Sequence, residues 1–339
     1  MEKALEIFSG LFLCAAIKYF ILLEKSPPNR IFAPNCHYSM KAAVGSVKDI
    51  SFSLIFSDFK EITKAKLSIS VLFSSIAGYF LGADQIQFPA LLLLIFGGYC
   101  MVGASNAYNQ IIEKDLDALM KRTADRPIPS GRMSVRTAFA IAVAMTVLGL
   151  WALYSLNAQT AMFGAISLFL YTSVYTPLKT KTPLSVFVGA FPGAIPFMLG
   201  WVAATGEFGI EPGTLFMIQF FWQFPHFWAL GWMLDEDYKR AGFKMLPTGK
   251  KDRGTALQTI LYTIWMIVIS IVPAFGITGS LQLSIVAALL VLLAGLVMLW
   301  FALGLYVKMD NATARKLMLA SVSYISLIQI IFVIDKFIR

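Results

Sequence analysis

Apolar stretches of about 20 residues recur along this chain, and they constrain its fold more than any other feature. A helix of about 20 apolar residues crosses the roughly 30 Å of hydrocarbon in a bilayer. Within lipid the backbone must satisfy its own hydrogen bonds, which a helix does. We therefore predict an all-α, polytopic membrane protein with nine membrane-spanning helices. The predicted spans cover residues 67–84, 88–108, 135–155, 158–178, 184–204, 213–234, 256–276, 282–306 and 316–336.

The composition agrees with this prediction, because 58% of the 339 residues are hydrophobic and only 14% are charged. Lysine and arginine are concentrated in alternate loops, whereas the intervening loops carry Asp84, Glu207 and Glu211 without a basic residue. Short basic loops stay on the cytoplasmic side of a membrane. We therefore expect the loops after the second, fourth, sixth and eighth spans to face the cytoplasm. This bias, together with anionic lipid head groups, accounts for the net charge of +9 without any binding of nucleic acid.

The N-terminal segment, residues 1–57, is read as an extension ahead of a membrane domain that covers residues 58–339. Residues 4–23 are apolar apart from two charges, so they could form a tenth span or a signal anchor. Alternatively, Met40 could be the true start, in which case residues 1–39 would be an artefact of start-site choice. His37 lies in the same segment and has no predicted role.

The three cysteines are Cys14, Cys36 and Cys100. Their spacing is typical of neither a disulfide framework nor a zinc site. We interpret them as ordinary small apolar residues.

A cluster of polar side chains follows the second predicted span. Asn109, Glu113 and Asp117 are spaced four residues apart, so on a helix they lie within an arc of roughly 80°. Asp115 points elsewhere on such a helix. Two carboxylates and an amide on one face suit a hard cation such as Mg²⁺, which takes one or two protein carboxylates together with substrate phosphates.

Basic side chains accompany these carboxylates, and a second charged loop follows the sixth predicted span. Arg122 and Arg126 are about one helical turn apart and could bind phosphate oxygens through paired hydrogen bonds. The second loop carries Asp235, Glu236, Asp237, Lys239 and Arg240. It could hold a second metal ion and the far side of a diphosphate. Because both loops are predicted to face the cytoplasm, we expect them to form one site.

The alternative for either loop is a solvated surface whose ion pairs are worth about 0–1 kcal/mol each. Asn106 and Asn109 argue against this alternative for the first loop. They lie in or at the end of an apolar span, where unpaired polar groups are costly and usually functional.

Four stretches of the chain resemble the UbiA-type intramembrane prenyltransferases. The first matches the Asn/Asp-rich first motif of that family through Asn109, Glu113, Asp115, Asp117, Arg122, Thr123, Arg126 and Pro127. The others are YTPLKTKTP at 175–183, GAFPGAIPFMLGW at 189–201 and FWQFPHFWALGWMLDEDYKRAGFKMLP at 221–247. These three resemble the branch of the family that farnesylates heme. The resemblance runs from about Asp58 to the C-terminus.

The resemblance implies a bundle of nine helices around a central cavity, with diphosphate bound beneath a cytoplasmic cap of two polar loops. It implies that Mg²⁺ is held by Asn109, Glu113, Asp117, Asp235 and Asp237. The residues it implies for diphosphate binding are Arg122, Arg126, Lys179, Lys181 and Arg240. Lys179 is expected to act in catalysis together with Asn109, Glu113 and Asp117.

Several positions depart from the usual pattern of the family. Glu113 stands where Asp is common, which keeps the charge and adds one methylene group. Thr180 follows Lys179 where a Lys-Arg pair is usual, and Lys181 comes one residue later. Phe197 replaces a frequent proline, and Ser185 a frequent asparagine. None of these changes removes a carboxylate that the chemistry needs.

The implied reaction transfers a farnesyl group from farnesyl diphosphate to a vinyl group of heme B, after which water adds to give heme O. Mg²⁺ and basic side chains would stabilise the charge that develops on the diphosphate. An apolar cavity would keep water from the allylic carbocation, and aromatic rings could stabilise it. The candidate rings, for each of which membrane packing is the simpler explanation, are Tyr108, Tyr171, Tyr175, Phe221, Trp222 and Trp228.

His226 is the one histidine inside a predicted span, where ionisable groups are functional candidates. It could contact heme or ligate its iron through a neutral imidazole. The alternative is a buried histidine bonded to a carbonyl group that Pro225 leaves free. In the fifth span, Pro192 and Pro196 predict a kinked or broken helix, although such residues also serve close packing in membranes.

The partners expected from the resemblance are farnesyl diphosphate, heme B and the lipid bilayer, and they could include heme A synthase or oxidase assembly proteins. The chain has no Arg-rich, acid-poor leader, which favours a bacterial inner membrane over a mitochondrial one. One competing interpretation is a UbiA-type enzyme that prenylates an aromatic acid or a quinone precursor. Another is a transporter for an anionic metabolite, which an internal inverted repeat would support. A purely structural membrane subunit would not need two facing acidic loops.

Overall fold

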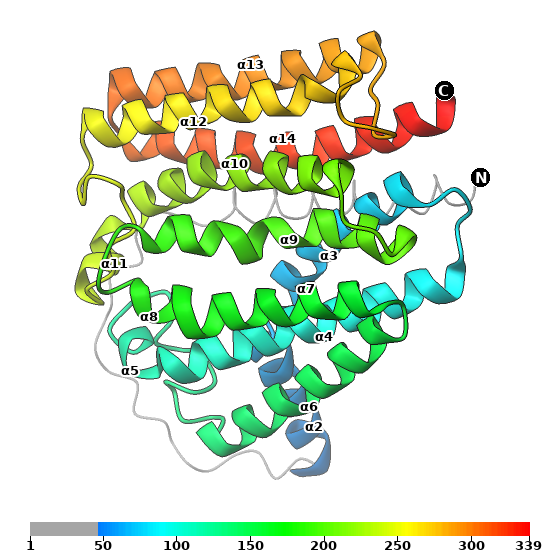
Figure 1. The fold of residues 1–339 in the computed structure, drawn as a ribbon. Helices are drawn as coiled ribbons and strands as arrows, with labels where there is room; N and C mark the ends of the chain where they lie inside the picture. The colour runs from blue at the N-terminus through cyan, green and yellow to red at the C-terminus, as the bar shows by residue number, and fades with distance from the viewer. Residues whose placement is uncertain (1–46) are drawn as a thin grey trace. The chain divides into compact units, whose positions relative to one another are not determined.

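The computed structural model describes residues 47–339, with side chains from residue 53 onward. The tenth span and the start site proposed for residues 1–39 therefore lie outside the described residues, as do Cys14, Cys36 and His37. Within the described part of the chain the secondary structure is helical throughout. Residues 53–339 form one compact unit, a bundle of long helices (Figure 1).

Eight helical segments in the described residues are long and apolar enough to cross a membrane. They are α3 (Ala65–Gly82), α4 (Phe88–Ile112), α6 (Val135–Tyr154), the segment Ala158–Leu178, α9 (Ser185–Thr205), the segment Arg253–Phe275, α13 (Ile285–Lys308) and α14 (Asn311–Ile338). The segment Ala158–Leu178 contains α7 (Ala158–Phe169), the π-helical η1 (Leu170–Tyr175) and α8 (Thr176–Leu178). The segment Arg253–Phe275 contains α12 (Arg253–Ile271) and η2 (Val272–Phe275). These segments agree with eight of the nine predicted spans to within a few residues.

The remaining predicted span, residues 213–234, corresponds to α10 (Ile210–Met233), which is not among those eight segments. Polar side chains such as Gln219, Gln223 and His226 lower its hydropathy. The predicted count of nine spans is therefore not confirmed. Even so, α10 has 24 residues, and it packs inside the bundle against α9, α12 and α14 (Figure 1).

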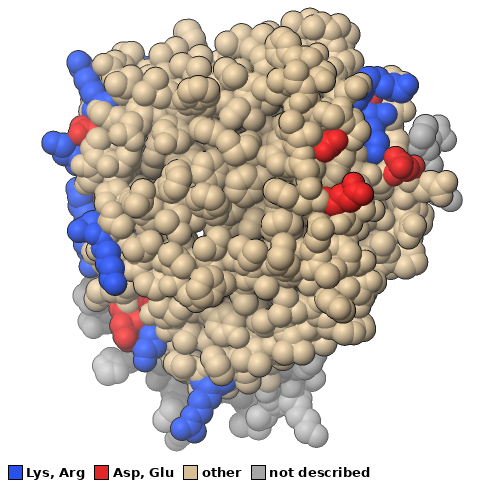
Figure 2. Space-filling view, viewed as in Figure 1, with Lys and Arg blue, Asp and Glu red and all other residues tan. Residues whose placement is uncertain are grey.

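Charged side chains are concentrated at the two ends of the bundle. Figure 2 shows a wide band without lysine, arginine, aspartate or glutamate across the face in view, with basic side chains along one edge. Such a band is what contact with lipid tails requires. The apolar helices and the uncharged band on their surface thus indicate an integral membrane protein.

The helices α3 and α9 pack closely in the interior, where glycines let the two backbones touch. A Cβ atom on Gly200 would lie 1.9 Å from the carbonyl oxygen of Ser75. One on Gly78 would lie 2.0 Å from the carbonyl oxygen of Phe197. Both approaches are closer than any side chain allows, so glycine at these positions is what permits the packing.

The prolines of α9 do not break the helix, which is continuous from Ser185 to Thr205. Pro196 has no N–H to donate to the carbonyl group of Pro192. The hydroxyl of Ser167 donates to that carbonyl oxygen instead, at 3.3 Å. A neighbouring helix thus supplies the hydrogen bond that the proline removes.

Candidate active site

Three short helices meet at one end of the bundle: α5 (Lys114–Asp117), α8 and α11 (Asp235–Arg240). All three lie at the left of Figure 1. Asp117 lies on α5, and Asp235, Asp237 and Arg240 lie on α11. The other predicted metal and diphosphate ligands lie at the end of α4 or in the loops that follow α5 and α8, so the candidate site lies at this end.

The first acidic motif is buried as its spacing predicts. The chain continues from α4 into α5 through a hydrogen bond from the Asp117 N–H to the Glu113 carbonyl oxygen, 2.7 Å long. Asn109, Glu113 and Asp117 are all buried, with exposures of 1%, 4% and 1%. Asp115 is exposed. All three residues of the predicted shared face are therefore buried.

Two buried ion pairs connect this motif to other parts of the chain. The ammonium of Lys179, at the end of α8, lies 2.8 Å from Oε1 of Glu113 and donates a hydrogen bond to Oε2 at 3.1 Å. Arg126 donates to Oδ2 of Asp117 at 2.6 Å. The side-chain NH₂ group of Asn109 donates to the hydroxyl of Thr176 at 3.1 Å, so the side-chain oxygen of Asn109 takes no part in this hydrogen bond.

The π-helical segment η1 comes directly before Thr176 and Lys179. The N–H of Thr176 donates to the carbonyl oxygen of Tyr171, five residues earlier, as in a π-turn. A π-turn inserts extra backbone into a helix and changes where the following side chains point, and such turns are frequent at functional sites. The Lys179 ammonium then lies 4.7 Å from the ring centre of Tyr175 and 5.5 Å from that of Phe243.

Each of the two buried carboxylates keeps one oxygen without a hydrogen bond, Oε1 of Glu113 and Oδ1 of Asp117. The first lies near the Lys179 ammonium but lacks hydrogen-bond geometry. Buried carboxylate oxygens normally bind donors or metal ions. Their chemistry fits Mg²⁺, which prefers oxygen ligands and needs only one or two carboxylates from a protein.

The second acidic loop pairs its carboxylates locally. Asp235 lies 2.8 Å from the ammonium of Lys239, and Asp237 forms an ion pair with Arg240. Among the described residues, no three His, Cys, Asp or Glu side chains are grouped closely enough to hold a metal ion. The structure therefore does not bring the predicted ligands Asp235 and Asp237 into one cluster with the first motif.

The two loops nevertheless touch through apolar contacts, and the second loop also bonds to the end of α8. The N–H of Lys244 donates to the carbonyl oxygen of Lys179 at 2.7 Å. Met120, from the first loop, packs in one cluster with Phe243 and Met245. A cavity of about 230 Å³ lies beside this contact. Its polar lining includes Asp235, Tyr238, Lys239 and Lys244.

Two residues that the sequence reasoning missed interact electrostatically with the site. Burial raises the pKa of Tyr238, and the largest opposing effect comes from the positive charge of Arg122. Burial, followed by the charges of Arg126 and Lys179, lowers the pKa of Lys64 to about 7. Lys64 precedes α3, and in the sequence it counts as one of several basic residues that set the orientation.

The other predicted diphosphate ligands are more peripheral. Arg122, Lys181 and Arg240 are exposed.

His226 lies on α10 and is bound to a neighbouring helix. Its Nδ1 is 2.8 Å from the hydroxyl of Ser321 on α14. Its ring stacks on that of Trp222 with centres 4.9 Å apart. The partner is thus a hydroxyl group, where the alternative reading of the sequence expected a carbonyl group.

The candidate aromatic rings fall into two groups. Tyr171 and Tyr175 lie next to the site, with ring centres 5.3 Å apart. The others are engaged in packing elsewhere. Tyr108 contacts Phe139, Trp222 stacks on His226, and Phe221 and Trp228 contact Tyr262.

Known proteins with similar sequences belong to the family that the fold and the motifs indicate. The UbiA prenyltransferase family matches residues 71–328, so the chain belongs to the UbiA prenyltransferase family. A protoheme IX farnesyltransferase from Christiangramia forsetii is 69% identical over 285 residues, which cover 84% of this chain and 95% of that relative. One from Flavobacterium psychrophilum is 67% identical over 288 residues, covering 84% and 96%. Within the family, the chain thus groups with the protoheme IX farnesyltransferases.

Solved structures support the same fold at much lower identity. A digeranylgeranylglyceryl phosphate synthase aligns with a TM-score of 0.71 and 17% identity over 84% of this chain and 99% of its own. A UbiA homolog from Archaeoglobus fulgidus, bound to DMAPP and Mg²⁺, aligns with a TM-score of 0.67 and 15% identity over 83% and 98%. At these identities the likeness concerns the fold.

Proposed function

We propose that the buried cluster around Glu113 and Asp117 is where this prenyltransferase binds farnesyl diphosphate with Mg²⁺. The reaction is transfer of the farnesyl group to a vinyl group of heme B, followed by addition of water, to give heme O and diphosphate. The observation that carries the proposal is the pair of buried carboxylates, each with one oxygen free of hydrogen bonds. Glu113 and Asp117 would offer carboxylate oxygens to a Mg²⁺ ion that accompanies farnesyl diphosphate.

Mg²⁺ is supported by the donor set in this chain and by the Archaeoglobus fulgidus homolog that carries it together with a prenyl diphosphate. When bound, the ion would neutralise negative charge on the diphosphate oxygens. Glu113 and Asp117 would hold it, together with the amide oxygen of Asn109. Asp235 and Asp237 would reach a second ion only after release from their ion pairs with Lys239 and Arg240.

The basic side chains would act as the carbon–oxygen bond breaks. Lys179 and Arg126 are already held at the cluster, so they need little rearrangement to bind the charge that develops on the leaving diphosphate. The ring of Tyr175 lies beside the Lys179 ammonium, and the ring of Tyr171 lies beside that of Tyr175; the two rings would stabilise an allylic cation. Arg122, Lys181 and Arg240 would guide the anionic substrate in from the aqueous side.

The farnesyl chain would extend from this end into the bundle. A cavity of about 40 Å³ lies in the interior between α3, α4, α6, α7 and α9, and it is lined mainly by apolar side chains such as Met101, Leu168 and Leu199. This volume is close to that of a single water molecule, so side chains must move to admit the chain. The flexible side chain of Met101 suits such a movement.

Heme B would reach the site from the bilayer or its surface. His226 remains the candidate for contact with the porphyrin, because its Nδ1 is bound to Ser321 and its Nε2 is left for another partner. The cationic end of the bundle would face the cytoplasm, in keeping with the alternation of basic loops. Because the matching relatives are bacterial, we place the protein in a bacterial inner membrane.

The test is an assay of membranes that contain the protein, supplied with heme B, farnesyl diphosphate and Mg²⁺, with the pigments identified by mass. Asp117→Asn should abolish heme O formation, and removal of Mg²⁺ should do the same. Asp115→Asn is the matched control, because this carboxylate is exposed two residues away and should be dispensable. His226→Ala should reduce transfer to heme while farnesyl diphosphate binding is kept.

Two results would count against the proposal. If Asp117→Asn retained activity comparable to Asp115→Asn, the buried cluster would not be the site. If heme B stayed unchanged while the same membranes prenylated an aromatic acid or a quinone precursor, the assignment of the acceptor would fail.

A further inference from the structure

The cavity of about 230 Å³ in the second acidic loop has both an apolar lining and a charged lining. Its apolar side chains are those of Phe243, Met245 and Leu246. Its polar side chains are those of Asp235, Tyr238, Lys239 and Lys244. A ligand that suits such a cavity combines an apolar body with a charged group.

Lys244 brings a positive charge to the cavity that no carboxylate of the described residues neutralises. Its ammonium donates to the carbonyl oxygen of Lys181 at 3.2 Å, and its backbone N–H donates to that of Lys179 at 2.7 Å. The ion pairs among the described residues do not include Lys244. The lysine is thus held in place before a ligand binds, which reduces the entropy lost when one does.

The other two charged groups of the lining offset each other. Asp235 and Lys239 are four residues apart on α11 and form an ion pair of 2.8 Å. The cavity therefore carries one uncompensated positive charge, that of Lys244. This charge matches a carboxylate, which carries one negative charge. A diphosphate is a poorer match, because a terminal phosphate alone carries about 1.5 to 2 negative charges at neutral pH.

Tyr238 adds a hydrogen-bond donor to the same cavity. Its hydroxyl has no hydrogen-bond partner among the described residues. A neutral phenol donates to a carboxylate oxygen, and hydrogen bonds to an ionised acceptor are stronger than those between neutral groups. The charges of Arg122 and Lys179 act on this hydroxyl, so Tyr238 borders both the cavity and the candidate active site.

Phe243 forms a wall that the cavity shares with the candidate active site. It lines the cavity, and its ring centre lies 5.5 Å from the Lys179 ammonium. The ring of Tyr238 lies beside it, with centres 5.9 Å apart. A molecule held in the cavity would therefore lie next to the ion pair of Lys179 with Glu113, where the proposed reaction releases diphosphate.

The acceptor of the proposed reaction has the chemistry that this lining recognises. Heme B combines an apolar porphyrin with propionate side chains, and its vinyl groups lie on the part of the ring away from the propionates. Charged groups are costly within the hydrocarbon of a bilayer. A propionate bound in the cavity would keep its charge at the cationic end of the bundle, and the vinyl groups would then point into the apolar interior.

We propose that this cavity binds a propionate group of heme B, with Lys244 as its ion-pair partner and Tyr238 as a hydrogen-bond donor. The inference rests on the proposed function, because heme B is the acceptor assigned there. It gives the acceptor a point of attachment apart from His226 and apart from the carboxylates of both acidic loops. Lys244 and Tyr238 would position the acceptor and would take no part in breaking the carbon–oxygen bond.

The experiment titrates the purified full chain with heme B and with its dimethyl ester, in which the propionates are uncharged. Each Kd is measured from the heme absorbance. The unaltered protein should bind heme B more tightly than the ester. Lys244→Gln loses one charge-assisted contact, so its Kd for heme B should rise about 10-fold while its Kd for the ester stays unchanged. Tyr238→Phe should raise the Kd for heme B about 3- to 10-fold.

Lys250→Gln is the matched control, because Lys250 is an exposed lysine of the same loop that does not line the cavity. It should bind heme B as the unaltered protein does. Lys244 is also exposed and forms no ion pair with another described residue, so both variants should unfold at the temperature of the unaltered protein. An unchanged Kd for heme B in Lys244→Gln would overturn the inference, and so would equal affinity of the unaltered protein for heme B and the ester.

Farnesyl diphosphate with Mg²⁺ serves as the second probe. Its Kd should be the same for Lys244→Gln as for the unaltered protein. If Lys244→Gln weakened the binding of farnesyl diphosphate more than that of heme B, the cavity would belong to the diphosphate and the inference would fail.

The binding measurements do not depend on turnover. A protein that distinguishes heme B from its ester through Lys244 yet leaves heme B unfarnesylated would refute the proposed reaction and keep the inference. Normal farnesylation combined with normal heme binding by Lys244→Gln would do the reverse. A full chain that binds no heme would refute both.

Discussion

The ammonium of Lys179 lies 2.8 Å from Oε1 of Glu113, although 66 residues separate the two in the sequence. Both side chains are buried. A buried charge without its partner is strongly unfavourable, so this ion pair fixes the end of α8 against the end of α4. The same contact that holds the fold together places a cation beside a candidate metal ligand.

Removal of Lys179 alone should therefore destabilise the protein. We expect Lys179→Met to lower the free energy of unfolding by about 3–5 kcal/mol, because it leaves the Glu113 carboxylate buried and unpaired. The double variant Lys179→Met/Glu113→Gln should regain most of that stability and still lack transfer activity. Unfolding in detergent without Mg²⁺ checks the first expectation. A single variant as stable as the original protein would contradict it.

The contact between α3 and α9 should tolerate no side chain at Gly200. A methyl group there would meet the backbone of Ser75, so the two helices must separate. We expect Gly200→Ala to cost about 1–3 kcal/mol of stability and to lower the unfolding temperature. Gly213→Ala on α10 is the control, since a Cβ atom there meets nothing within 4 Å. Equal behaviour of the two variants would show that the helices adjust freely.

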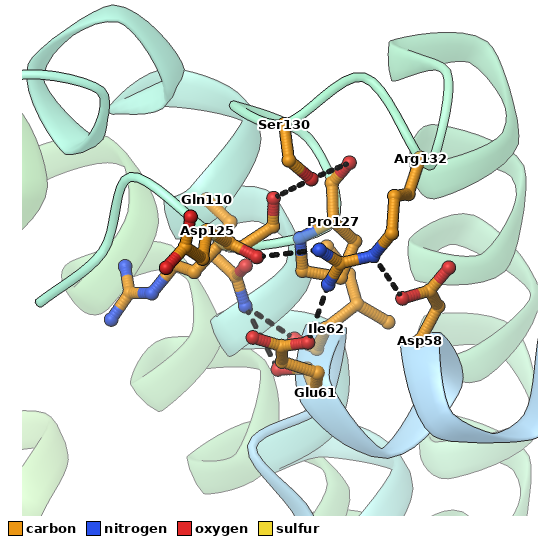
Figure 3. Close-up of polar contacts among 9 residues, drawn as sticks. Asp58, Glu61, Ile62, Gln110, Asp125, Pro127, Ser130 and Arg132 are labelled. Atoms are coloured by element: carbon orange, nitrogen blue, oxygen red, sulfur yellow. Dashed lines mark hydrogen bonds and ion pairs between the residues drawn. The ribbon is translucent and has the colours of Figure 1, made fainter. Parts of the chain in front are cut away.

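Arg132 should matter more for substrate affinity than for stability. Its ion pairs with Asp58 and Glu61 are partly exposed, so Arg132→Gln should change the free energy of unfolding by less than about 1 kcal/mol. Because Arg132 also holds the loop that carries Arg126 through the Asp125 carbonyl oxygen (Figure 3), its loss should raise the KM for farnesyl diphosphate several-fold while the KM for heme B does not rise. Arg136→Gln, at an exposed position nearby, should leave both unchanged. A rise in both values would indicate general damage to the site.

Asp252 should give a pH-dependent contribution to stability. It caps α12 by accepting a hydrogen bond from the Thr255 N–H at 2.8 Å, and this bond lowers the pKa of its carboxyl group below 3.8. A carboxyl group with a lowered pKa stabilises the folded state above its unfolded-state pKa and loses that effect as the pH falls through its folded-state pKa. Asp252→Ala should therefore cost about 1 kcal/mol at pH 7. The difference in unfolding temperature should shrink below about pH 4; a constant difference down to pH 3 would argue against the cap.

Sequence patterns are sufficient to predict the spanning helices because backbone groups within lipid must form hydrogen bonds with one another. A long apolar run has to become a helix, and the run predicted at 88–108 is indeed helical within Phe88–Ile112. The helix α10 is less apolar than the others because it carries amides and a histidine, and the sequence does not show which neighbours bond to them.

Some features of the candidate active site could be predicted from one short stretch of sequence, whereas others depend on contacts between distant parts of the chain. Helical spacing predicts that Asn109, Glu113 and Asp117 share a buried face, since that depends on one short stretch. The pairing of Lys179 with Glu113 depends on how distant helices pack. The left-handed backbone conformation of Lys64 depends on side chains from α4 and from the loop after α5 that bind the residues before it, and no local pattern separates Lys64 from its neighbour Lys66.

The π-turn at Leu170–Tyr175 makes the active site depend on the number of residues in a helix as well as on their identity. One residue fewer in that turn would allow a regular α-helix, in which each position advances by about 100°. Thr176 and Lys179 would then rotate away from Asn109 and Glu113 although both residues were still present. A sequence can thus keep every side chain of the candidate site and lose the site through a single deletion between them.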